Sequence, residues 1–239
     1  MSCEITMLLG DCLDIMSTLT EHSVDAVITD LPYGTTQNVW DTIIPFEPMW
    51  LQVKRLLKAN GSFVTTCSQP FTSMLVMSNL KDFKYEWIWN KITATGHLNA
   101  HNRPMLQHEN IVVFYAHTAV YNPQDIQPYN KLVRRGGNGS NYGSAGTSNI
   151  QEFTNYPRTI LSMTRNTSKL HPTQKNVALY EYLIRTYTNP CDVVLDIAAG
   201  SGTTGIAAIN TGRSAILIEK DAAYFDVMVK RIDKHLEVL

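Results

Sequence analysis

The chain has 239 residues, 44% of them hydrophobic and 17% charged, which predicts one α/β domain with an insertion and excludes two full enzyme domains. No apolar run is long enough to cross a bilayer and no basic-then-apolar leader opens the chain, so we expect a cytoplasmic protein without a membrane partner. The net charge is −1, but residues 131–175 contain seven basic residues and one acidic residue, a local charge of +6 that suits a nucleic-acid partner.

Short apolar runs alternate with segments of helical period, a pattern typical of βα units and a mostly parallel sheet. In chain order, strands are predicted at 5–9, 24–29, 62–67, 85–89, 110–115, 193–197 and 215–218, and helices at 46–58, 70–80, 174–187, 203–210 and 222–236. Seven strands fit a doubly wound, Rossmann-like α/β sheet. The periodicity fails between 116 and 170, so we expect a single domain over 1–239 with an insertion at 117–170. A floppy surface insertion is the alternative interpretation.

A first candidate site follows the predicted strand 24–29. The run Thr29-Asp30-Leu31-Pro32-Tyr33-Gly34 places an acid, a proline and an aromatic at the carboxyl end of a strand, where open α/β sheets bind ligands. An ordinary strand-ending turn explains the same residues equally well.

A second candidate site follows the predicted strand 193–197. Asp196 precedes a glycine-rich run at 200–205 that opens a helix, and Glu219 ends the next strand. This spacing also occurs in dinucleotide-binding dehydrogenases. However, only twenty residues follow Glu219, and a carboxylate at 196 suits a cationic amino-acid end better than a pyrophosphate. If the strands ending at Asp30 and Asp196 are neighbours where the sheet reverses its order, both loops face one crevice.

These motifs resemble those of the DNA amino-methyltransferases in their permuted order. Asp30-Leu31-Pro32-Tyr33 resembles the catalytic Asp-Pro-Pro-Tyr motif, and 196–204 resembles the Asp-Pro-Phe-x-Gly-Ser-Gly-Thr-Thr cofactor loop. The resemblance covers nearly the whole chain and is weakest at about 117–165. It extends to Gly10-Asp11-Cys12, Ser23-Val24-Asp25, His171-Pro172-Thr173-Gln174-Lys175, Ile218-Glu219-Lys220-Asp221 and Tyr224.

The resemblance implies methyl transfer from S-adenosylmethionine to N6 of a flipped-out adenine in double-stranded DNA, as in bacterial and phage modification methylases of restriction–modification systems. Asp30 and the Leu31 carbonyl would accept the two N–H bonds of the amine, and Tyr33, next to Pro32, would stack on the base. This chemistry requires no metal. The implied cofactor-binding residues are Asp11, Cys12, Asp30, Pro172, Thr173, Asp196, Ala198, Gly200, Ser201, Gly202, Thr203, Thr204 and Glu219.

Two residues depart from the family pattern. Leu31 replaces a proline but keeps the backbone carbonyl, whereas Ala198 removes an aromatic side chain near the cofactor. The alternatives are cytosine-N4 methylation, more distantly protein glutamine or RNA methylation, and a DNA-binding relative that has lost transfer, which only Ala198 supports. Asp30 favours adenine, because cytosine enzymes of the family more often have serine there.

The resemblance also implies a homodimer. Separately, we expect basic side chains to contact the DNA. His97 and His101 have the spacing of metal ligands on a helix, but the surrounding Gly and Asn residues favour a DNA-facing loop. The predicted DNA-binding residues are Lys91, Arg103, Arg134, Arg135, Arg158 and Arg165.

Overall fold

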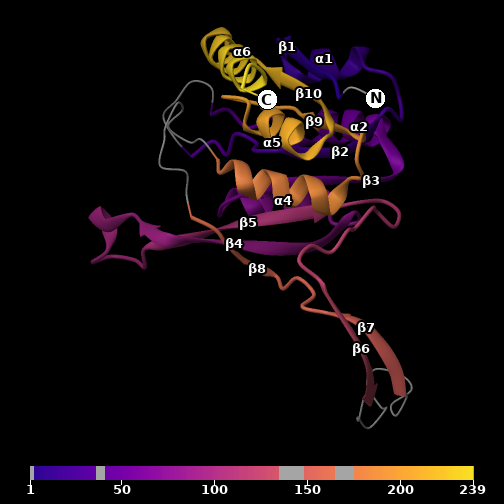
Figure 1. The fold of residues 1–239 in the computed structure, drawn as a ribbon. Coiled ribbons are helices and arrows are strands. Elements are labelled where there is room, and N and C mark those ends of the chain that lie inside the picture. Colours follow the sequence, from indigo (N-terminus) through magenta and orange to yellow (C-terminus); the bar gives the residue numbers. More distant parts are fainter. Residues whose placement is uncertain (1–2, 36–40, 135–147, 165–174, 239) are drawn as a thin grey trace. The chain divides into compact units, whose positions relative to one another are not determined.

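The structure is a computed structural model that describes residues 3–35, 41–134, 148–164 and 175–238, the side chain of Arg134 excepted. The predicted site residues Arg135, Arg165, Pro172 and Thr173 lie outside the described residues. The chain divides into two compact units, one formed by Met1–Asn122 with Thr159–Leu239 and the other by Pro123–Arg158 (Figure 1).

The larger unit is built on an eight-stranded sheet with the strand order β1-β10-β9-β2-β3-β5-β4-β8. β5 pairs antiparallel with both β3 and β4, and all other neighbours are parallel. The strands are β1 (Ile5–Leu9), β2 (Val24–Thr29), β3 (Leu57–Cys67), β4 (Phe83–Thr95), β5 (Leu106–Phe114), β8 (Ile160–Ser162), β9 (Val193–Asp196) and β10 (Ser214–Glu219).

The predicted number of strands was too low by one. The additional strand is β8, which pairs with the edge strand β4 over three residues. Three residues are too few to show a period in the sequence, so only the pairing reveals this strand. The predicted bounds of β1 and β2 agree with the structure.

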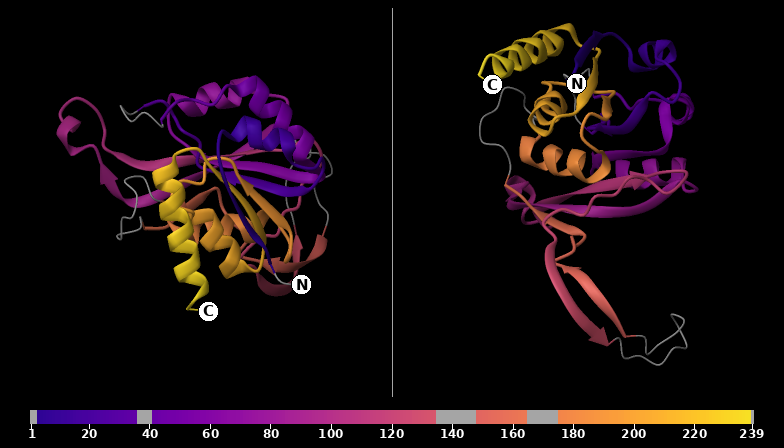
Figure 2. Two further views of the ribbon diagram at one scale, coloured as in Figure 1. Left: turned by 90° about the horizontal axis from the view of Figure 1, so that it is seen from above. Right: turned by 45° about the vertical axis from the view of Figure 1, so that its right-hand side comes forward.

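Helices cover both faces of the sheet (Figure 2). Their bounds are α1 (Cys12–Thr18), α2 (Phe46–Leu56), α3 (Phe71–Ser78), the 3-10 turn η1 (His97–Asn99), α4 (Val177–Tyr187), α5 (Thr203–Thr211) and α6 (Ala222–Leu236). One buried cluster joins the sheet to α1, α2 and α3, and a second joins it to α4, α5 and α6. Along β2, Ala26 and Ile28 belong to the second cluster and Val27 to the first, because successive strand residues point to opposite faces.

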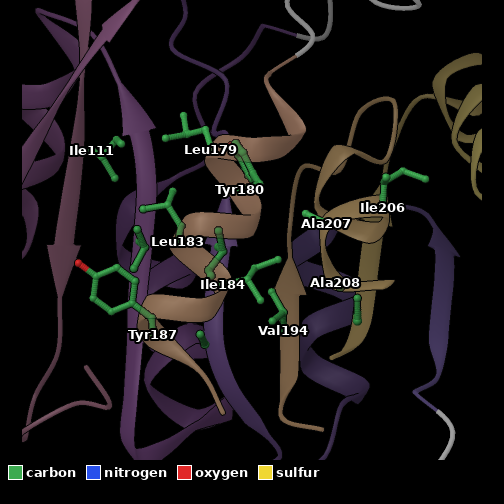
Figure 3. Packing of buried hydrophobic residues seen from close by; sticks show 14 of the residues in the cluster. Ile111, Leu179, Tyr180, Leu183, Ile184, Tyr187, Val194, Ile206, Ala207 and Ala208 are labelled. Carbon is green, nitrogen blue, oxygen red and sulfur yellow. The ribbon is translucent and has the colours of Figure 1, made fainter. Parts of the chain in front are cut away.

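The α4 side of the sheet is filled mainly by aliphatic side chains. In Figure 3, Ile184 of α4 lies towards Val194 of β9, whereas Leu183 lies on the side of α4 where Ile111 of β5 is seen. Ala207 and Ala208 of α5 belong to the same cluster, and their small side chains allow α5 to approach closely. None of the helices within the described ranges is long and apolar enough to span a membrane.

The smaller unit contains the strands β6 (Gln127–Arg134) and β7 (Ser148–Thr154), which form an antiparallel pair. The sequence predicted no element here. Most of the described side chains on these two strands are exposed, so no buried face imposes the alternation of apolar and polar residues by which strands are recognised.

Candidate active site

The two motif loops meet where the sheet reverses direction. From β2 the chain runs through α2 to β3 on one side, and from β9 it runs through α5 to β10 on the other. β2 and β9 are parallel neighbours, and the Thr29 hydroxyl donates a 2.6 Å hydrogen bond to Asp196 Oδ1. The prediction that the strands ending near Asp30 and Asp196 are neighbours at the switch point is therefore confirmed.

The glycine-rich loop has its backbone set by two left-handed residues, Gly200 with φ +53° and Gly202 with φ +78°. A Cβ atom on Gly202 would lie 2.7 Å from Met228 Cγ, so packing against α6 requires glycine there. A Cβ atom on Gly200 would meet none of the described atoms within 4 Å. The absence of a side chain at Gly200 therefore leaves open space next to its Cα at the carboxyl edge of the sheet, which lets a ligand approach closely.

Asp196 is enclosed by this loop, with 3% of its surface exposed. Its carboxylate accepts hydrogen bonds from the Thr204 hydroxyl and the Ala198 amide in addition to that from Thr29. Burial raises the pKa of Asp196 to about 6, and the neighbouring Asp30 adds to the increase. Through these hydrogen bonds Asp196 holds the loop in its conformation. Its contact with a cofactor ammonium stays a prediction.

The loop is also held from α6 and from the end of β10. Glu219 accepts hydrogen bonds from the amides of Gly200 (2.7 Å) and Asp221 (2.8 Å), and burial raises its pKa. Arg231, which the sequence analysis missed, donates to the hydroxyls of Ser201 (3.2 Å) and Thr203 (3.1 Å). These hydroxyls thus face α6, and Arg231 also donates to the Ser201 carbonyl at 2.9 Å, so this arginine holds the loop to the helix.

Asp11 follows β1, the strand beside β10. Its Oδ1 accepts a hydrogen bond from the Leu13 amide and caps α1, and its Oδ2 pairs with Lys220 at 3.1 Å. Cys12 is buried below it, and burial raises the pKa of its thiol to about 11. The ends of β1, β10, β9 and β2 therefore present four acidic residues in consecutive order along one edge of the sheet: Asp11, Glu219, Asp196 and Asp30.

Asp30 is held through one of its two oxygens. Oδ1 accepts hydrogen bonds from the hydroxyls of Tyr33 (2.8 Å) and Thr66 (2.6 Å) and lies 3.2 Å from Lys175 Nζ. Among the described residues, no hydrogen bond or ion pair is made to Oδ2. Three donors on one oxygen fix the orientation of the carboxylate and leave the other oxygen free to accept a further hydrogen bond.

The three residues after Asp30 in this motif pack against the rest of the larger unit. The ring of Tyr33 stacks on Phe71 with centroids 5.2 Å apart and an interplanar angle of 28°. Burial raises its pKa well above the usual range, as do Asp30 and Glu109, so the hydroxyl stays protonated as a donor. Leu31 is 3% exposed and packs in the cluster with α1, α2 and α3. Pro32, between them, is partly buried.

The structure corrects the assignment of Lys91 to the DNA-binding residues. Its ammonium lies 3.0 Å from Glu109 and is 5% exposed, because β4 and β5 bring the two residues together inside the protein. Arg103 and Arg158 are exposed and stay predictions, as does Arg134 at the end of β6. His97 begins η1, and no three His, Cys, Asp or Glu side chains gather as a metal site among the described residues.

Two residues near Asp30, Thr66 and Glu109, were not predicted from the sequence. The contact between Lys175 and Asp30 was not predicted either. Lys175 belongs to the quoted run 171–175, so the resemblance marked its neighbourhood but not its partners. Thr66 and Glu109 carry no sequence signal, because only the pairing of β2, β3 and β5 brings Thr66 to Asp30 and Glu109 to Lys175.

A doubly wound sheet with an acidic loop and a glycine-rich loop at its switch point defines a Rossmann-like enzyme of the methyltransferase type. The DNA methylase family, N6_N4_Mtase, matches residues 24–230, and the chain belongs to this family.

Similar proteins of known name agree with this family. The chain is 28% identical over 262 residues to DNA adenine methyltransferase YhdJ of Escherichia coli (strain K12), covering 95% of this chain and 82% of that protein. It is 27% identical over 242 residues to type II methyltransferase M.HpaI of Haemophilus parainfluenzae, covering 95% and 74%.

Solved structures agree as well. The crystal structure of the M1.HpyAVI–SAM complex matches with a TM-score of 0.66 at 28% identity, over 95% of this chain and 99% of that one. The PvuII cytosine-N4-specific DNA methyltransferase matches with a TM-score of 0.70 over 99% and 92%, and at 17% identity this likeness shows the fold alone.

Proposed function

We propose that this protein transfers a methyl group from S-adenosylmethionine to N6 of adenine in double-stranded DNA. The proposal rests mainly on the carboxylate of Asp30 at the switch point. Three partners orient this carboxylate through Oδ1, which leaves Oδ2 to accept a hydrogen bond from the substrate. A relative named as a DNA adenine methyltransferase and a similar structure named as a SAM complex support the choice of base and cofactor.

The residues at the sheet edge fit this cofactor, which is cationic at its sulfonium and ammonium groups. Four acidic residues follow neighbouring strands, and the space next to the Gly200 Cα is open. The hydroxyl of Tyr180 is buried without a hydrogen-bond partner in the described part of the chain, and burial raises its pKa, to which Asp30 and Asp196 add. A buried hydroxyl without a partner is a position that a ligand can satisfy.

S-adenosylmethionine, when bound, supplies the electrophilic methyl group. Asp11 and Glu219 would hold its nucleoside, Asp196 its amino-acid end, and the backbone from Ala198 to Thr204 would line it. By resemblance, Cys12, Pro172 and Thr173 belong to the same site.

The protein's own contribution is to position the amine. An adenine amine is a poor nucleophile because its lone pair is delocalised into the ring, and a carboxylate with the ordinary aspartate pKa of about 3.9 is too weak a base to deprotonate it. Asp30 Oδ2 and the Leu31 carbonyl can instead accept its two N–H bonds, which favours a pyramidal nitrogen. Tyr33 would stack on the base after it leaves the duplex. Orientation of this kind contributes several powers of ten in rate.

Product analysis tests the proposal directly. The purified protein is incubated with methyl-labelled S-adenosylmethionine and duplex DNA, which is then digested to nucleosides and resolved by mass spectrometry. We expect N6-methyladenine. A predominance of N4-methylcytosine would contradict the choice of base, and no transfer to any DNA would contradict the proposed function.

The catalytic assignment is tested with Asp30→Ala, which should stay folded and lose nearly all transfer, because the amine loses an acceptor that matters most in the transition state. Asp233→Ala on the exposed surface of α6 is the matched control and should keep wild-type activity. An Asp30→Ala enzyme within a few-fold of wild type would show that the site is assigned wrongly.

For DNA binding we propose that the basic stretch 131–175, which overlaps the target-recognition insertion at 117–170, meets phosphates. Lys175 is not part of this contact, because it pairs with Asp30 and Glu109 inside the protein. Neutralising Arg134 and Arg135 together should weaken DNA binding and reduce the log–log salt slope by about two at most, since each phosphate contact releases about 0.9 counterion. An unchanged slope would assign both to ordinary surface. By resemblance we also propose a homodimer in the bacterial cytoplasm, and sedimentation velocity distinguishes it from a monomer.

A further inference from the structure

Asp30 is the first member of a buried row of alternating charges. Lys175 Nζ lies 3.2 Å from Asp30 Oδ1 and 2.8 Å from Glu109 Oε2, and it also donates to the Tyr33 hydroxyl at 3.4 Å. The Lys175 side chain is 11% exposed. All three of its N–H bonds therefore have partners inside the protein.

The row continues through Glu109, whose Oε2 pairs with Lys175. Its Oε1 lies 3.0 Å from Lys91 Nζ. Burial alone raises the pKa of Glu109, but the two ammonium groups outweigh it and lower the pKa to about 2. Burial disfavours the charged form of Lys175, yet Asp30 and Glu109 raise its pKa above the usual range. Two carboxyl and two amino side chains thus alternate along the row, and their formal charges sum to zero.

The arrangement separates two effects that a single lysine would combine. A lysine on Oδ1 orients the carboxylate, but its charge also opposes the positive charge that develops on the amine during methyl transfer. Glu109 lies on the far side of Lys175 from Asp30 and offsets that charge, and Lys91 keeps Glu109 ionised and in place. A buried carboxylate without such a partner would be protonated instead.

We propose that Lys175 is a positioning residue that fixes Asp30 through Oδ1, and that Glu109, held by Lys91, cancels the charge of Lys175 beside the reacting amine. This inference rests on the proposed function for the identity of the amine. It assigns Glu109 and Lys91 a role in the reaction although they do not contact Asp30.

This row supplies the positive charge next to Asp30, because the other titratable groups around it are phenols, a thiol and carboxyls. Lys175 is the sole cation that contacts Asp30 among the described residues. The remaining titratable groups that face Asp30 or its partners are Tyr33 in the same loop, Cys67 on β3, Glu86 on β4, Tyr180 on α4 and Asp196 on β9.

The test compares charge-unbalanced and charge-balanced variants. Single-turnover rates are measured from pH 5 to 9 at saturating DNA and S-adenosylmethionine, with Lys230→Met, an exposed residue of α6, as control. Lys175→Met removes the ammonium that lies between the carboxylates of Asp30 and Glu109. We therefore expect at least a tenfold lower rate at pH 7.5, and the acidic limb of the pH–rate profile should shift up by about one pH unit. Lys175→Met/Glu109→Gln restores the balance, so its limb should return towards that of wild type and its rate should exceed that of Lys175→Met several-fold.

Each outcome bears on the inference. A wild-type pH profile in Lys175→Met, or a double variant no faster than Lys175→Met, would overturn it, because a merely structural role predicts additive damage. If Lys175→Met does not fold, Glu109→Gln decides: at least a fivefold loss of rate with an unchanged KM for the cofactor supports the inference, and an unchanged rate refutes it.

Failure of the proposed function is recognised separately. If the wild-type protein transfers no methyl group to adenine, the ¹³C titration of the Asp30 carboxyl, assigned with Asp30→Asn, still tests the charge row. We expect a higher pKa in Lys175→Met than in wild type and a return in the double variant, and equal values in all three proteins would overturn the inference.

Discussion

The hydroxyl of Thr66 offers a sharp test of how Asp30 is held. Thr66 lies in β3 with 1% of its surface exposed and donates a 2.6 Å hydrogen bond to Asp30 Oδ1. Thr66→Val keeps the shape of the side chain and removes this donor. A hydrogen bond to a charged group contributes about 1.5–3 kcal/mol. Because Tyr33 and Lys175 remain on the same oxygen, we expect roughly half of this, about 1.4 kcal/mol, to be lost from the transition state, which is about tenfold in kcat.

The neighbouring residue provides the matched control. Thr65 is equally buried, but its hydroxyl donates to a backbone carbonyl, that of Thr66, and not to Asp30. Thr65→Val should therefore cost stability without a specific loss of kcat. The assay is single-turnover methyl transfer, with unfolding in urea to show that both variants are folded. If the kcat of Thr66→Val lies within twofold of that of Thr65→Val, the hydroxyl does not orient Asp30 and the reasoning fails.

Three further predictions follow from the packing and charges of the two loops. Gly205→Ala places a Cβ atom 2.6 Å from Leu217 Cδ1, so overpacking of about 1–3 kcal/mol should exceed the gain of about 1 kcal/mol in helix propensity, and a variant as stable as wild type in urea would contradict this. Leu31→Pro keeps the backbone carbonyl and should retain activity within a few-fold while losing about 1 kcal/mol of buried contact, whereas a folded but inactive variant would argue against the carbonyl's role. Asp196 has a pKa raised to about 6, and a cation favours its ionised form, so calorimetry should show cofactor binding weakening as pH falls through 6; a Kd constant from pH 5 to 8 would exclude this contact.

Much of the central fold is readable from local patterns. The predicted bounds of β1, β2 and α6 agree with the structure. The two strands are short, mostly apolar runs, and α6 has a helical period that begins after the cap provided by Asp221. Short or exposed elements were missed: α1 has seven residues, β8 has three, and β6 and β7 have no buried face. A sequence period reports burial, so elements that bury little escape it.

The two motifs were legible because each is a run of consecutive residues whose backbone must adopt one conformation, as at Gly200 and Gly202. Their meeting was predictable in part, since the carboxyl ends of parallel strands share one edge of a sheet. The assignment of Lys91 to DNA was wrong for the complementary reason: whether a charged side chain is exposed depends on its partner, and Glu109 becomes that partner only after β4 and β5 pair.

The sequence by itself determined the alternation of elements, the acidic loop after β2 and the glycine-rich loop after β9, because these follow from residue types within a few positions of one another. Only the tertiary structure decided how Asp30 is held. Besides Tyr33 of its own loop, its contacts come from Thr66 and Lys175, and that lysine is balanced by Glu109. These residues lie far apart in the chain and converge through the strand order and the docking of the segment before α4. The cost of burying a charge makes such partners necessary, but it does not say which distant residue supplies them.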